Sequence, residues 1–157
     1  MKYYPIPLRV DAIMKGKKLN DEIDIRESIH QNIRLILKSY TLSYRYDASF
    51  GSLLNKYQAN TPPQNIKESL WRKRMREKFQ KNLKTLLIKY ETRIKVKDIR
   101  VKFIVLGKQQ EAVMNVSIEI TGEMSIGRRE KFHYPDSEIT DDAKEVFPLL
   151  IPVGNPK

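Results

Sequence analysis

The protein has 157 residues, and its 30 Lys and Arg against 19 Asp and Glu give a net charge of +11. This length predicts one domain with a core of its own. The absence of cysteine excludes disulfides, thiolate zinc sites and cysteine nucleophiles. No stretch approaches the roughly 20 apolar residues of a membrane span, and no signal peptide is visible. We therefore expect a cytoplasmic protein that does not insert into a membrane.

The positive charge is concentrated in one part of the chain. Residues 1–64 carry a net +4, residues 65–106 a net +10 and residues 107–157 a net −3. We divide the chain into an N-terminal arm (1–21), a main domain (22–134) and an acidic, proline-rich tail (135–157). Such a distribution is typical of a polyanion-binding protein or of a subunit whose basic surface meets an acidic partner.

The first helix is expected to begin after Asp24. This residue and Glu27, three positions later, have the spacing of a capping box. Apolar residues then recur every three or four positions and form one stripe. The stripe consists of Ile25, Ile29, Ile33, Ile36 and Tyr40. A turn follows at residues 47–51, where Gly51 suggests a positive φ or a close backbone approach.

The second helix is expected from Asn65, with Glu68 completing another capping box, to about Tyr90. Its apolar stripe is Trp71, Met75, Phe79, Leu83, Leu86 and Tyr90. A basic face lies opposite this stripe. The basic face is formed by Lys73, Arg74, Lys78, Lys81 and Lys84. Much of the net charge of the protein is therefore predicted to lie on one side of one helix.

Alternating apolar residues predict strands after Arg93. The alternation slips by one position at Asp98, which indicates a bulge in the first strand. Residues 114–120 form the second strand, and Thr121-Gly122 is interpreted as a turn. The third strand is predicted to place Met124, Ile126, Phe132 and Tyr134 on one face. Helices followed by a meander predict an α+β fold, with two helices on a three-stranded antiparallel sheet and the arm as a candidate fourth strand.

Residue chemistry offers little support for catalysis. His30 and His133 have no partner at a meaningful spacing, so we interpret both as ordinary structural histidines. The carboxylates around residue 24 are explained by their position at a helix N-terminus. The sequence contains no phosphate-binding loop, dinucleotide fingerprint or metal-spaced cluster. We expect no catalytic residues, no metal and no cofactor.

Glu91 and Arg93 lie where the second helix ends and a strand begins. From composition alone, this pair is interpreted as a surface salt bridge, which contributes only about 0–1 kcal/mol. The order of motifs gives it more weight. Tyr46-Asp47 leads into Phe50-Gly51, and the basic helix ends in Tyr90-Glu91-Thr92-Arg93-Ile94 before a strand hairpin. With the first-helix segments Ser28-Ile29 and Gln31-Asn32-Ile33, this order resembles the phage baseplate wedge ("lysozyme-like") family, and more closely its TssE-type component of type VI secretion.

The resemblance implies a structural role. Members of this family link the baseplate wedge to the first ring of the contractile sheath, and pairing with an open strand edge is the expected physical mode. Their signature is Glu-Pro-Arg, so the resemblance implies partner-binding roles for Glu91 and Arg93 and a turn motif at Phe50 and Gly51. Thr92 replaces the proline and removes its fixed φ. The implied partners are other wedge subunits and sheath proteins, without a small-molecule substrate or nucleic acid.

Two alternative functions remain open. The family label suggests a peptidoglycan hydrolase, for which a pair of carboxylates would be required. The net charge of +10 in residues 65–106 suggests a nucleic-acid-binding protein, although no known nucleic-acid module matches.

Overall fold

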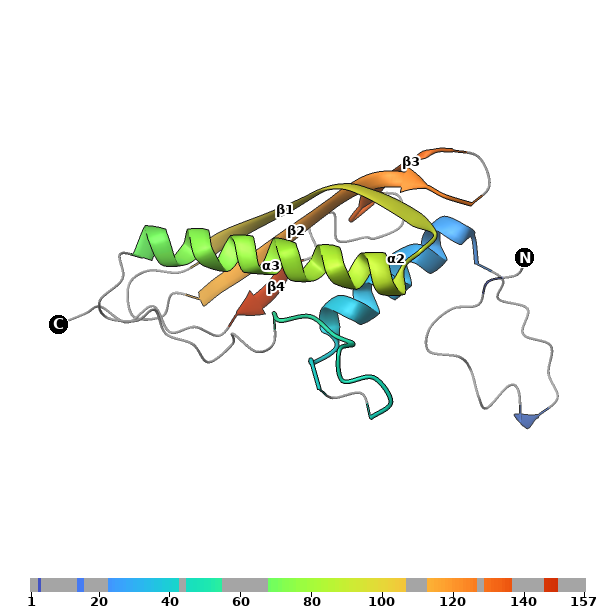
Figure 1. The fold of residues 1–157 in the computed structure, drawn as a ribbon, viewed down its shortest axis with the longest axis horizontal. Helices are drawn as coiled ribbons and strands as arrows, with labels where there is room; N and C mark the ends of the chain where they lie inside the picture. The colour runs from blue at the N-terminus through green and yellow to red at the C-terminus, as the bar shows by residue number, and fades with distance from the viewer. Residues whose placement is uncertain are drawn as a thin grey trace.

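The computed structural model describes residues 3, 14–15, 23–42, 45–54, 68–106, 113–126, 129–136 and 146–149. Two helices precede an antiparallel sheet, which confirms the predicted α+β class (Figure 1). In chain order the elements are α2 (Ile25–Lys38), α3 (Glu68–Tyr90), β1 (Ile94–Leu106), β2 (Val113–Met124), β3 (Lys131–Tyr134) and β4 (Val146–Leu149). The cap predicted at Asn65 and nearly all of the N-terminal arm lie outside the described residues.

Helix α2 begins and ends at polar capping residues. The side chain of Asp24 accepts a hydrogen bond from the backbone N–H of Arg26 at 3.2 Å, as predicted for the N-cap. At the other end, the backbone N–H and the hydroxyl of Ser39 both donate to the carbonyl of Leu35, at 2.9 and 2.7 Å. Of the predicted stripe, Ile29, Ile33 and Ile36 are fully buried and Ile25 is partly buried. Tyr40 lies beyond the end of α2 and is 55% exposed, so its place in the stripe was predicted wrongly.

Strand β2 is the centre of the sheet. It pairs with β1 along its whole length, from Ile94↔Met124 to Leu106↔Val113. On its other edge, β3 pairs with residues 120–123 and β4 with residues 114–117. The tail segment 146–149 therefore adds a fourth strand to the predicted three-stranded meander. Strands β3 and β4 follow one another along the same edge, separated by residues 135–145 of the chain.

The bulge in β1 is confirmed, but the turn predicted after the second strand is wrong. The register shifts between Val96 and Asp98, at the position of the predicted slip. Thr121 and Gly122 lie inside β2 opposite this bulge, so β2 continues to Met124. A Cβ atom on Gly122 would lie 2.5 Å from the carbonyl oxygen of Lys95. Gly122 thus allows the backbones of β1 and β2 to approach closely. Besides a bulge or a bend, such a close approach is a common reason for glycine inside a strand.

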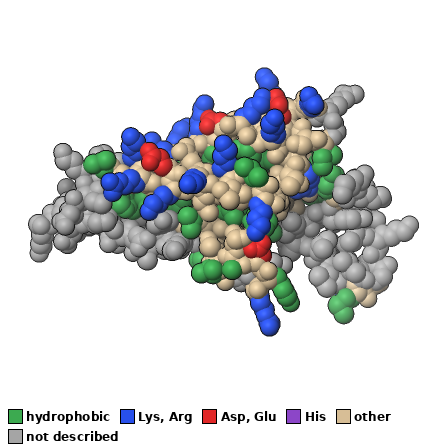
Figure 2. Space-filling view, in the orientation of Figure 1, with side chains coloured by type: hydrophobic (Ala, Val, Ile, Leu, Met, Phe, Trp, Pro, Cys, Tyr) green, Lys and Arg blue, Asp and Glu red, His purple; other side chains and the backbone are tan. Residues whose placement is uncertain are grey.

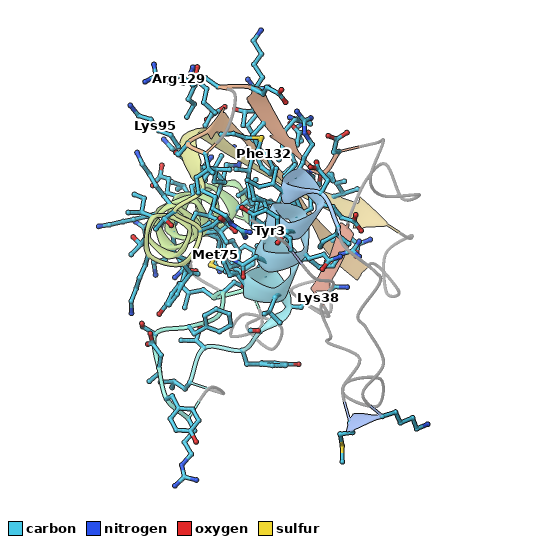
Figure 3. The ribbon with its side chains drawn as sticks, turned by 90° about the vertical axis from the view of Figure 1, so that its right-hand side faces the viewer. Tyr3, Lys38, Met75, Lys95, Arg129 and Phe132 are labelled. Carbon is cyan, nitrogen blue, oxygen red and sulfur yellow. The ribbon has the colours of Figure 1, made fainter. Side chains whose placement is uncertain are left out.

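Both helices cover one face of the sheet (Figures 1 and 3). His30 of α2 lies 5.0 Å from Phe132 of β3 between ring centroids, and Phe79 of α3 lies 6.1 Å from Phe103 of β1. Strands β1, β2 and β3 therefore turn apolar residues into one shared core. The buried strand residues are Ile94, Ile99, Val101, Val116, Ile118, Ile120, Met124, Phe132 and Tyr134. The opposite face carries charged residues, which include the ion pairs Lys97–Glu123 and Lys102–Glu119.

Candidate functional site: the helix-to-strand elbow

The elbow between α3 and β1 contains a bidentate ion pair. Arg93 donates from Nε to Glu91 Oε1 at 2.7 Å and from Nη2 to Glu91 Oε2 at 2.5 Å. The side chain of Glu91 is only 1% exposed and that of Arg93 is 19% exposed. Hydrogen bonds to Glu91 raise the pKa of Arg93 above its ordinary value. The surface salt bridge that composition alone suggested is thus a buried, two-bond contact of the strong type.

Helix α2 is tied to the same elbow. Asn32 donates from its amide to Glu91 Oε2 at 2.8 Å and to the backbone carbonyl of Tyr90 at 3.0 Å. Ser28, one turn earlier, accepts from Arg93 Nη1 at 2.9 Å. Sequence reasoning gave Ser28 and Asn32 no role of their own. Their spacing of four places them on one face of the helix. This spacing is the feature of the sequence from which a shared contact could have been predicted.

The arm also reaches the elbow. Arg93 lies over the ring of Tyr3 at 5.6 Å from the centroid, a cation–π geometry. Tyr3 in turn accepts a backbone hydrogen bond from Ile23 at 3.1 Å, immediately before α2. The guanidinium of Arg93 therefore contacts α2, the arm and its own elbow. Thr92, where the related signature has proline, is exposed.

A second network attaches the loop after α2 to the end of α3. Asp47 accepts from the Ser49 backbone at 2.9 Å, from Lys89 Nζ at 3.0 Å and from the Tyr90 hydroxyl at 2.7 Å. Hydrogen bonds from Ser49, then from Tyr90 and Lys89, hold the pKa of Asp47 well below its ordinary range. This network lies next to the elbow because Tyr90 immediately precedes Glu91.

Phe50 and Gly51 close this loop. Gly51 has φ +103°, and a Cβ there would lie 2.7 Å from the backbone carbonyl of Tyr40, so both properties predicted for this glycine are present. Phe50 packs edge-on against Tyr90, with ring centroids 5.1 Å apart. The turn motif thus acts within the molecule, where it positions the loop against α3.

The network around Ser49 contains a hydroxyl next to an amine, which is the arrangement of a serine–lysine nucleophile. Lys89 Nζ donates to Ser49 Oγ at 2.6 Å. Hydrogen bonds with Tyr90 and Asp47 raise the pKa of Lys89, however, so this amine stays protonated and is a poor general base. Of the predicted acidic cluster, Asp24 serves as the helix cap. Among the described residues, no group of three or more His, Cys, Asp or Glu is arranged to hold a metal ion.

The basic face of α3 lies apart from the elbow. All five of its side chains are exposed, and none forms an ion pair with another residue in the described ranges. Figure 2 shows basic side chains along the length of this helix. No helix in the described part of the chain is long and apolar enough to cross a membrane.

Comparison with known proteins gives limited similarity. The sequence matches no protein-family model and no curated protein. Among solved structures, the chain is similar to the crystal structure of a "putative tail lysozyme" from Geobacter sulfurreducens, with a TM-score of 0.48 and 16% sequence identity. The similarity covers 82% of this chain and 93% of that one.

Proposed function

We propose that this protein is a structural baseplate subunit of a contractile injection machine of the type VI secretion kind. In this role it links the wedge to the first ring of the sheath. The observation that carries the proposal is the buried Glu91–Arg93 pair, which lies at the charged positions of the Glu-Pro-Arg signature. Because the pair ties α2 to the α3–β1 elbow, its role would be to fix the direction in which β1 leaves the elbow.

Strand β1 offers the surface that this role needs. It is 13 residues long and pairs with β2 on one edge only. Along the other edge, Gln80 of α3 donates to the carbonyl of Ile99 at 2.7 Å, but no described strand pairs there. An open strand edge is normally avoided because it invites pairing with another chain. In the proposed role, a strand of the sheath or wedge adds to this edge.

The proposal is tested by complementing a deletion strain with Arg93 variants and imaging a fluorescent sheath protein. Arg93→Ala removes the contacts to Glu91, Ser28 and Tyr3, and we expect it to abolish sheath assembly while the purified protein remains folded by circular dichroism. Lys131→Ala, which removes an exposed cation from β3 and leaves β1 and the elbow unchanged, is the matched control and should support normal assembly. Normal sheaths with Arg93→Ala would rule out the proposed role of the elbow.

A further inference from the structure

The side of α3 that faces away from the sheet has a regular pattern. Leu70 and Ile88 are 48% and 65% exposed, although both are large aliphatic residues. Charged residues occupy the positions between them on the same side of the helix. The resulting outer line of α3 consists of Leu70, Arg74, Glu77, Lys81, Lys84 and Ile88.

The outer line stays on one side of α3 from end to end. Its members follow one another at intervals of four, three, four, three and four residues, and the average of about 3.6 is the repeat of one face of an α-helix. From Leu70 to Ile88 the line extends about 27 Å along a helix with a rise of 1.5 Å per residue. A partner helix of ordinary length could therefore contact both aliphatic ends at once.

The cations on this side outnumber the carboxylates. Glu77 is the one acidic residue of the outer line, and Arg74, Lys81 and Lys84 form no ion pair within the part of the chain that the structure describes. On the outer face of the sheet, by contrast, Lys97 and Lys102 are paired with carboxylates at 2.5 and 2.7 Å. Figure 2 shows basic side chains distributed along α3. A surface of this kind attracts an acidic partner.

We infer that the outer line of α3 is a docking surface for an acidic α-helix of another protein. The aliphatic ends, Leu70 and Ile88, would bury apolar side chains of that helix, and the cations between them would face its carboxylates. Nucleic acid fits less well, because its phosphates would contact the cations but would leave the two exposed aliphatic residues without an apolar partner. This inference does not depend on the proposed baseplate role, which rests on the elbow and on β1.

The test measures binding of the full chain to three labelled probes by fluorescence anisotropy. The first is a synthetic Glu-rich helical peptide with two leucines 18 positions apart. The second is the same peptide with both leucines replaced by serine, and the third is a 25-base-pair DNA duplex. We expect the leucine peptide to bind about tenfold more tightly than the serine peptide, because two apolar contacts are buried. Equal binding of the two peptides, or tighter binding of DNA than of the leucine peptide, would overturn the inference.

Variants separate a specific surface from net charge. Ile88→Ser should weaken binding of the leucine peptide about fivefold and leave binding of the serine peptide unchanged. The double variant Lys81→Glu and Lys84→Glu should weaken both peptides by about tenfold or more. The control, Lys97→Glu with Lys102→Glu, makes the same change of net charge on the sheet. If the control weakened binding as much as the α3 variant, net charge alone would explain the interaction and the inference would fail.

Discussion

At the scale of single residues, Glu91 connects separate parts of the chain. Its carboxylate accepts three hydrogen bonds from Arg93, one of them from the backbone N–H, and one from Asn32 of α2, and its side chain is 1% exposed. A buried carboxylate is costly unless its oxygens are hydrogen-bonded, and these four hydrogen bonds meet that requirement. Glu91 therefore holds α2 to the elbow and keeps Arg93 oriented.

Replacing Glu91 by glutamine tests this role. Glu91→Gln removes the negative charge and turns an amide donor toward a donor of Arg93 or Asn32. We expect the free energy of unfolding, measured by urea denaturation, to fall by about 2–4 kcal/mol, since breaking a buried pair leaves an uncompensated charge. The matched control is Glu119→Gln, at an exposed pair with Lys102, which should cost less than about 1 kcal/mol. Equal losses for the two variants would contradict the special role of Glu91.

Asp47 should make stability depend on pH. Its pKa is lower in the folded protein than the ordinary value, so its contribution is fully present at neutral pH and is lost as the pH falls through the acid range. Asp47→Asn should lower the melting temperature at pH 7. The difference from the wild type should begin to shrink below about pH 5. A difference that stays constant between pH 7 and pH 3 would show that the charge of Asp47 is not involved.

The elbow shows the limits of sequence reasoning for single residues. The sequence identified Glu91 and Arg93 as an ion pair, but it predicted an exposed one. Whether such a pair is buried depends on Tyr3, Ser28 and Asn32, which lie about 60 to 90 positions away in the chain. Spacing along the sequence carries no information about contacts at that distance. Gly51, by contrast, was predictable because its constraint is local.

At the scale of elements, the helices were easier to predict than the strand ends. Helical stripes extend over several turns, so the burial of Ile33 and Phe79 follows from periodicity alone. The end of β2 was placed four residues too early, at residue 120 instead of Met124, because Thr121-Gly122 resembles a turn. The glycine is there for a different reason, the close approach of the bulge in β1. The close contact between β1 and β2, and not the turn preference of Thr121-Gly122, therefore determines the backbone conformation at this position.

The close approach at the bulge predicts the effect of Gly122→Ala. The added Cβ would lie 2.5 Å from the carbonyl oxygen of Lys95 and 3.3 Å from Cα of Val96. Both atoms belong to the backbone, so the strands must shift to make room. We expect a loss of about 2–3 kcal/mol in the free energy of unfolding. Thr121→Ala, the neighbouring position in β2, is the control and should cost no more than about 1 kcal/mol. A neutral Gly122→Ala would show that the bulge adapts freely.

At the scale of the whole molecule, charge is arranged by surface. The outer face of the sheet pairs its cations with Glu119 and Glu123, and hydrogen bonds from Lys102 and Lys97 lower the pKa values of these two carboxyls. The basic face of α3 has no such compensation among the described residues. The net charge of +11 thus reflects one helix surface more than a uniformly basic protein. The location of the basic face could be predicted from the sequence because its residues follow helical periodicity. The ion pairs on the sheet could not, because they depend on the register between β1 and β2.

The tail contributes to the sheet, which gives a prediction for the whole molecule. Strand β4 pairs with residues 114–117 of β2 and covers that part of its edge. A truncation after residue 136 should expose this edge and promote association between chains, visible as a larger mass in light scattering. Amide hydrogen exchange in residues 114–117 should also become faster. A truncation after residue 150, which keeps β4, is the control and should behave as the full chain. If both truncations remained monomeric with unchanged exchange, β4 would not be what protects β2.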